Sequence, residues 1–190
     1  ASYGLAHIGE GDEIILSMME HHSNIVPWHF LRERQGAVLK WVDVGEDGSL
    51  DIEALDAAIT GKTKLVAVTH MSNVLGTVTP LKEIVARAHA KGVPVLADGC
   101  QGAVHGVVDV RALDVDFYAI TGHKLYGPTG IGALLLRRGV QLRPQLFGGG
   151  KSRNGWQASC SSSSGSICPC CAQWPSWSYF FPRCRRIQPS

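Results

Sequence analysis

The stretch Thr121-Gly122-His123-Lys124-Leu125-Tyr126-Gly127-Pro128-Thr129-Gly130 lies between two apolar segments, residues 117–120 and 131–136. Both segments have the length and composition of buried strands. A lysine between two buried strands is costly, because burial disfavours the charged ammonium group. An isolated lysine would more simply lie on the surface at a strand end, but the flanking glycines and His123 argue against that alternative. We therefore expect Lys124 to belong to a functional site.

Strand and helix patterns alternate along the chain before this stretch. Several helices carry end signals, with Asn24 or Ser23 as a cap, Gly36 as a stop, Asp51 as a cap and Pro80 in a first turn. The expected strands are residues 13–17, 37–44, 64–69, 93–97, 114–120 and 131–137, and the expected helices are residues 1–8, 25–34, 51–59 and 81–90. This alternation predicts an α/β fold, a three-layer and mostly parallel sheet with helices on both faces.

The composition is that of an ordinary globular protein of 190 residues, with 45% hydrophobic and 18% charged residues. The net charge of +2 is too small to indicate a nucleic-acid or membrane partner. No apolar run approaches the ~18 residues of a membrane span, and no signal peptide is recognisable. Of the cysteines, only Cys100 lies in the regularly patterned part, which therefore resembles a reduced, cytoplasmic protein. The first residues have a mid-helix pattern, so we expect the chain to begin inside a domain.

Polar clusters follow four of the expected strands. They are His21 with His22, residues 70–73, residues 98–101 and residues 121–124. In parallel sheets, ligands bind beyond the carboxyl ends of the strands. The four clusters therefore predict one shared site at that edge of the sheet.

The residue types in these clusters fit pyridoxal 5'-phosphate (PLP), which needs a lysine, an acid, a covering ring and phosphate donors. Lys124 would hold the cofactor as a Schiff base. Asp98 would face the pyridine nitrogen as a charge-assisted partner, although an aspartate here could equally cap the next turn. His21 would cover one face of the ring. Glu20, His21 and His22 could instead bind a metal, but adjacent residues on extended backbone point apart, so we expect no metal.

Four motifs together resemble the cysteine desulfurase/selenocysteine lyase family, in its SufS-like branch. This family lies within the class V aminotransferase group of fold-type-I PLP enzymes. The likeness runs from about residue 1 to residue 150. The motifs are Met19-Glu20-His21-His22-Ser23-Asn24-Ile25-Val26-Pro27-Trp28, Thr69-His70-Met71-Ser72-Asn73-Val74-Leu75-Gly76, Ala97-Asp98-Gly99-Cys100-Gln101 and residues 121–132.

The resemblance implies two catalytic residues. Lys124 matches the Schiff-base lysine, which also moves the substrate proton. His21 matches the imidazole that stacks on the cofactor ring.

The resemblance also implies the contacts that hold the cofactor. Asp98 matches the partner of the pyridine nitrogen, and Gln101 matches the donor to the phenolic oxygen of the ring. Thr121 and His123 match phosphate contacts, and Asn73 matches a residue beside the cofactor and the substrate carboxylate. His22, His70 and Cys100 are expected to have supporting or structural roles.

The implied reaction converts L-cysteine to L-alanine and passes sulfur to an enzyme cysteine as a persulfide. A sulfur-acceptor protein of the SufE or SufU kind would then take the sulfur for iron–sulfur cluster assembly. L-selenocysteine is the alternative substrate, which would make the protein a selenocysteine lyase, and the family is usually homodimeric. The alternative of another class is a non-catalytic fragment that at most binds PLP.

Residues 151–190 resemble nothing in the family and keep no helix or strand period. We therefore expect residues 1–150 to be a partial PLP-binding large domain and residues 151–190 to be a disordered or frame-shifted tail. Cys168 and Cys171 form a C-x-x-C without the second pair or histidine of a zinc site. By the resemblance, the phosphate loop would precede residue 1. The substrate-binding arginine and the nucleophilic cysteine would follow Gly150 and are not in this chain, which is therefore expected to be inactive alone.

Overall fold

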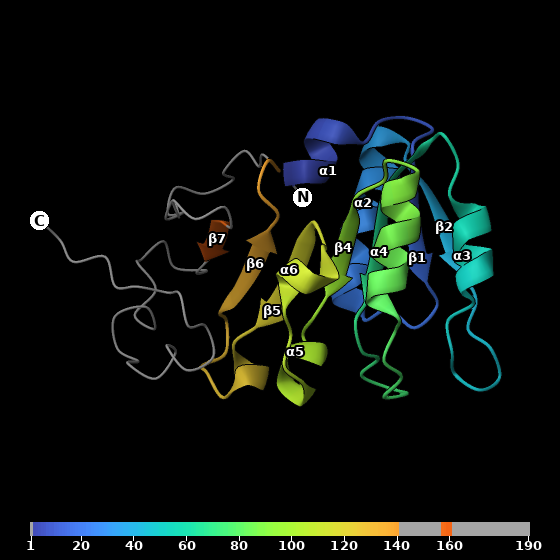
Figure 1. The fold of residues 1–190 in the computed structure, drawn as a ribbon. Helices are drawn as coiled ribbons and strands as arrows, with labels where there is room; N and C mark the ends of the chain where they lie inside the picture. Colours follow the sequence, from blue (N-terminus) through green and yellow to red (C-terminus); the bar gives the residue numbers. More distant parts are fainter. Residues whose placement is uncertain (1, 141–156, 161–190) are drawn as a thin grey trace, which may run out of the picture.

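The computed structural model describes residues 2–140 and 157–160. Within these ranges one seven-stranded sheet has the order β2-β1-β3-β4-β5-β6-β7 (Figure 1). Strands β2, β1, β3, β4 and β5 are mutually parallel, whereas β5–β6 and β6–β7 are antiparallel pairs. The predicted mostly parallel α/β sheet is therefore confirmed.

The strands are β1 (Glu13–Ser17), β2 (Val38–Val42), β3 (Thr63–Thr69), β4 (Val95–Asp98), β5 (Phe117–Thr121), β6 (Gly132–Leu136) and β7 (Gln157–Cys160). The α-helices are α1 (Ser2–His7), α2 (Val26–Gln35), α3 (Ile52–Ala58), α4 (Leu81–Ala90), α5 (Gly102–His105) and α6 (Val110–Leu113). Two short 3-10 helices are η1 (His22–Asn24) and η2 (His123–Leu125). None of the described helices has the length and apolarity needed to cross a bilayer.

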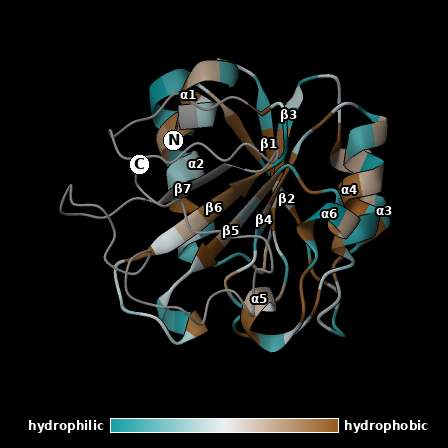
Figure 2. Ribbon diagram, turned by 60° about the vertical axis from the view of Figure 1, so that its left-hand side comes forward, coloured by the Kyte–Doolittle hydropathy of each residue, from teal (hydrophilic) through white to brown (hydrophobic). Residues whose placement is uncertain are grey.

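Helices cover both faces of the sheet, because successive strand residues point to opposite sides (Figure 2). On one face Ile15 of β1 packs in a cluster with Leu55 of α3 and Ile84 of α4. On the other face Ile14 of β1 packs in a cluster with Trp28 of α2. The three layers therefore follow from the short apolar strands, of which β1 and β3 are buried on both sides.

Three of the expected helix ends are confirmed. The Asp51 side chain caps α3 by accepting a bond of 2.9 Å from Ala54 N, and Pro80 directly precedes α4. Gly36 ends α2 with φ at 72°, a left-handed conformation that glycine adopts without strain. The cap expected at Asn24 or Ser23 is wrong, because Ile25 stands at the start of α2 without a side-chain cap. The buried Asn24 amide bonds Glu20 and Trp28 instead.

Two other expectations need correction. The strand expected at 114–120 begins only at Phe117, because Asp114 ends α6 with φ at 57° and the buried Asp116 side chain accepts a 2.8 Å bond from Val95 N. Strand β7 lies in residues 151–190, where the sequence indicated no regular element. Strand β7 is formed by pairing with β6, and its own sequence pattern does not indicate a strand.

Charged side chains tie the strands together at the amino-terminal edge of the sheet. Glu13 Oε2 lies 2.9 Å from Lys40 Nζ of β2, and it accepts hydrogen bonds of 2.6 Å from Thr60 Oγ1 and 3.1 Å from Thr63 Oγ1. Burial opposes ionisation of Glu13, but these hydrogen bonds outweigh it and hold its pKa below the ordinary value of 4.5.

A carboxyl group whose pKa is lowered by folding stabilises the protein above its ordinary pKa, and this contribution is lost as the pH falls. We therefore expect Glu13→Gln to lose less of its free energy of unfolding than the parent between about pH 5 and about pH 3. Urea unfolding at several pH values measures the difference. The exposed Glu33→Gln variant is the control and should follow the parent. Parallel curves for parent and Glu13→Gln would contradict the expectation.

Candidate functional site

The loops after β1, β3, β4 and β5 meet at the carboxyl edge of the parallel strands, at the bottom of Figure 1. These loops and the last residues of β4 and β5 carry all the residues that the sequence assigned to a site. In the sheet Thr69 of β3 pairs with Asp98 of β4, and Asp98 pairs with Ala119 of β5. Parallel pairing therefore brings together segments that are far apart along the chain.

Asp98 is the last residue of β4, and it is 7% exposed. Its Oδ1 accepts a hydrogen bond of 3.0 Å from Cys100 N, so the carboxylate does close the following turn, as the alternative interpretation proposed. The main chain around Asp98 is also fixed, because its carbonyl oxygen accepts a bond of 2.9 Å from His70 N. This hydrogen bond uses only Oδ1 of the carboxylate. Asp98 can therefore close the turn and also interact with a second group.

Lys124 lies in η2, directly after β5, and it is half-buried. Its turn is closed by a 2.7 Å bond from Gly122 N to the Ile131 carbonyl oxygen and a 2.9 Å bond from Gly127 N to the Gly122 carbonyl oxygen. An added Cβ on Gly122 would lie 3.1 Å from the Ile131 oxygen, which explains the glycine at this close backbone approach. The lysine therefore stands on a turn that is bonded across its base.

Cys100 connects the acid to the lysine electrostatically. Burial raises the pKa of its thiol, the neighbouring Asp98 raises it further, and Lys124 lowers it, with a net value of about 12. A thiol with this pKa is neutral at physiological pH and a poor nucleophile. This agrees with the structural role expected for Cys100.

Thr121 and His123 lie together beside the lysine, with Thr121 Oγ1 at 2.9 Å from His123 Nδ1. His21 is exposed at the start of η1, where its Nδ1 accepts a 3.2 Å bond from Ser23 N. The His21 and His22 ring centroids are 6.1 Å apart with planes inclined at 64°. Across residues 2–140 no group of three or more His, Cys, Asp or Glu residues is placed to bind a metal ion.

Asn73 and Gln101 lie at the same edge without a described contact to the other site residues. Asn73 is exposed in the loop after β3, and Gln101 is half-buried just before α5. The structure therefore joins Asp98 to Cys100 by a hydrogen bond, places Lys124 at the same edge, and pairs Thr121 with His123. His21, Asn73 and Gln101 share only the edge with them. The assigned roles of all these residues remain predictions.

Sequence reasoning missed a buried support under the Asp98 turn. His70 Nδ1 lies 2.8 Å from the hydroxyl of Tyr118, a β5 residue that is 1% exposed. An added Cβ would overlap the Tyr118 ring at Gly99, and it would lie 2.5 Å from His70 Nδ1 at Gly102. The two glycines after Asp98 were the available signal, since both are required by the packing of this pair.

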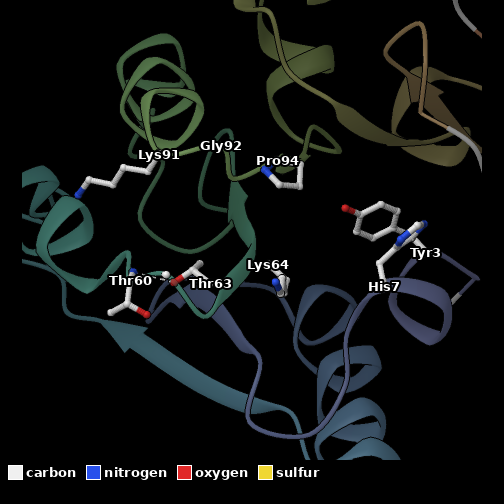
Figure 3. Close-up of a pocket in the computed structure, with 9 residues that line it drawn as sticks. Tyr3, His7, Thr60, Thr63, Lys64, Lys91, Gly92 and Pro94 are labelled. Atoms are coloured by element: carbon white, nitrogen blue, oxygen red, sulfur yellow. Dashed lines mark hydrogen bonds between the residues drawn. The ribbon is translucent and has the colours of Figure 1, made fainter.

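The cavity of about 390 Å³ in Figure 3 lies at the opposite edge of the sheet. It is lined by Tyr3, His7, Thr60, Gly61, Thr63, Lys64, Lys91, Gly92 and Pro94, which precede or begin strands β3 and β4 or belong to α1. In Figure 3 the Lys91 side chain points away from Tyr3, and its Nζ lies 2.8 Å from Asp56 Oδ1. This cavity contains none of the residues assigned to the site.

Gly99→Ala is expected to destabilise the chain by about 1–3 kcal/mol, because the new methyl group would overlap the buried Tyr118 ring. Gly61→Ala is the matched control, since no atom lies within 4 Å of its added Cβ. It should change stability by less than about 1 kcal/mol. Equilibrium unfolding in urea measures both values, and equal stability of the two variants would refute the packing argument.

Known proteins show the same arrangement of sequence and fold. The chain matches the family model described as Aminotransferase class-V over residues 1–164. It is 51% identical over 150 residues to a cysteine desulfurase of Enterobacter sp. (strain 638) and 52% identical to one of Salmonella choleraesuis (strain SC-B67). Each alignment covers 78% of this chain and 37% of the relative, so the chain spans little more than a third of these relatives' length.

Solved structures agree with the sequence matches. The cysteine desulfurase CsdA (S-sulfonic acid) from Escherichia coli aligns with a TM-score of 0.74 at 37% identity, over 87% of this chain and 43% of that one. The apo cysteine desulfurase from Thermococcus onnurineus NA1 aligns with a TM-score of 0.71 at 33% identity, over 85% and 42%. The resemblance expected from the four motifs is thereby confirmed, and the chain belongs to the class-V aminotransferase family.

Proposed function

We propose that this chain supplies the cofactor-binding part of a PLP-dependent cysteine desulfurase, a transferase. The observation that carries the proposal is that the neighbouring parallel strands β4 and β5 bring the buried Asp98 carboxylate and the half-buried Lys124 to the same edge of the sheet. Opposite effects of the two groups on the pKa of the Cys100 thiol support it. The match to cysteine desulfurases at 51% identity supports the choice of reaction.

The donor set fits PLP. An acid for the pyridine nitrogen, an amine for the aldehyde, and a hydroxyl–imidazole pair for the phosphate all lie at one edge of the sheet. When bound, PLP supplies an electron-withdrawing ring that weakens bonds at the α-carbon of an amino acid. Asp98 would keep the ring nitrogen protonated, because a buried carboxylate favours the cationic partner. Thr121 and His123 would hold the phosphate, and Gln101 would donate to the phenolic oxygen.

Lys124 would hold the cofactor covalently and move a proton at its Nζ, while His21 would cover one face of the ring. Asn73 would lie beside the cofactor and the substrate carboxylate. We further propose L-cysteine as the substrate, L-alanine as the product and a SufE- or SufU-like protein as the sulfur acceptor. L-selenocysteine is the alternative substrate. A cytoplasmic homodimer, a domain boundary near residue 150 and a non-homologous tail complete the proposal.

The first test is covalent capture of PLP by Lys124. The parent chain should retain an absorbance band of bound PLP after desalting, and borohydride reduction should place the label on the peptide that contains Lys124. Lys124→Ala should lose both signals, because it removes the amine that would hold the cofactor. Lys62→Ala, an exposed lysine in the turn before β3, is the control and should behave as the parent. A parent without the band, or a label spread over many lysines, would overturn the proposal.

The second test is turnover of L-cysteine with a reductant present. We expect little or no sulfide from this chain alone, since the resemblance places the attacking thiol and the carboxylate-binding arginine beyond residue 150. A PLP-loaded chain without turnover also fits the alternative of a non-catalytic, PLP-binding fragment. Sulfide release well above that of Lys124→Ala would instead mean that a cysteine of residues 160–184 acts as the nucleophile. Replacing these cysteines by serine would then identify it.

A further inference from the structure

A buried chain of hydrogen bonds runs from the end of β3 to helix α2. Glu20, which is 9% exposed, accepts a bond of 2.9 Å from Thr69 N at its Oε1, and Ser17 Oγ donates to the same oxygen. Its Oε2 accepts a bond of 2.7 Å from Asn24 Nδ2. Asn24 Oδ1 in turn accepts a bond of 3.2 Å from Trp28 Nε1. All of these hydrogen bonds therefore donate toward Glu20, and each of its three hydrogen-bond partners is a donor.

The setting of Glu20 is unusual for a buried acid. No ion pair to Glu20 is found among residues 2–140, so neutral donors alone compensate the carboxylate. Burial raises its pKa, the three hydrogen bonds lower it, and the nearby Asp98 raises it, with a net rise. A buried acid without a cation is costly to keep. An apolar side chain at this position would leave the buried Thr69 N–H and the Asn24 amide without an acceptor, so the carboxylate fixes the positions of both donors.

Glu20 and Asn24 enclose the segment that carries His21. The turn between them is closed by a 2.8 Å bond from Asn24 N to the His21 carbonyl oxygen. On the other side, Thr69 is paired with Asp98 in the β3–β4 ladder. The Glu20 carboxylate is thus the side-chain link between the turn of His21 and the strand end that is aligned with Asp98.

We propose that Glu20 is a positioning residue, whose carboxylate clamps the 21–24 turn onto the end of β3 and so sets His21 relative to Asp98. The inference rests on the proposed function, in which His21 covers the ring that Asp98 holds. Glu20 itself touches neither cofactor nor substrate. It acts through the backbone of the turn.

The direction of the hydrogen bonds allows a sharp test. In Glu20→Gln the new NH2 group must face either Asn24 Nδ2 or the Thr69 N–H, and both are donors. In Asn24→Asp the new carboxylate would stand against the Glu20 carboxylate. The double variant Glu20→Gln/Asn24→Asp restores every pair, because the new amide accepts from Thr69 and Ser17 and donates to the new carboxylate, which also accepts from Trp28. The net charge of the double variant equals that of the parent.

Hydrogen–deuterium exchange of the chain without PLP measures directly how firmly Glu20 holds the 21–24 turn. Each single variant should exchange about tenfold or more faster than the parent at residues 21–24. The double variant should return to within about twofold of the parent. Peptides of α4 serve as the internal control and should be unchanged. Unchanged exchange at 21–24 in the singles, loss of protection in α4 as well, or a double variant no better than the singles would each overturn the proposal.

Visible circular dichroism of bound PLP reads the consequence for His21. At equal PLP occupancy the single variants should lose severalfold in signal, His21→Ala should lose as much, and the double variant should recover it. Dichroism that is unchanged in the singles would overturn the coupling to His21. If the parent bound no PLP while exchange followed the expected pattern, the proposed function would fail and the clamp on the 21–24 turn would stand.

Discussion

Parallel pairing of β3, β4 and β5 is the constraint on which the site depends. It aligns Thr69 with Asp98 and Asp98 with Ala119, so three chain segments end at one edge. A parallel ladder fixes both direction and register, because a slip of one residue would turn every side chain to the other face. Asp98 can be buried at a strand end only because the apolar layers on both faces hold that register.

Most of the fold could be predicted from the sequence, because its strands are short apolar runs bounded by turn residues. The segments 13–17 and 64–69 became β1 and β3 almost unchanged, and Asp51, Pro80 and Gly36 marked helix ends correctly. Asn24 was misassigned as a cap because asparagine has the same donor and acceptor whether it caps a helix or joins a buried network. Tertiary contacts decide between the two, and the local sequence does not contain them.

For the candidate site, the sequence predicts which strand ends meet, and the roles of the residues there remain predictions. Strand-end reasoning places Asp98 and Lys124 at one edge, since it needs only the order of strands. It could not find the His70–Tyr118 pair or the bond from Thr69 to Glu20, because these contacts join residues that are 48 and 49 positions apart. Only Gly99 and Gly102 indicated this packing indirectly, because a side chain at either position would overlap Tyr118 or His70.

The reversal of chain direction between β5 and β6 places the turn of Lys124 in a hairpin. Residues 122–131 join two antiparallel neighbours and are bonded across their base by Gly122 and Ile131. The backbone entropy of this turn is therefore lost when the sheet folds and not when a ligand arrives. When a ligand binds a lysine on such a hairpin, only the side-chain rotations of the lysine remain to be restricted. A larger share of the interaction free energy therefore contributes to the affinity for the ligand.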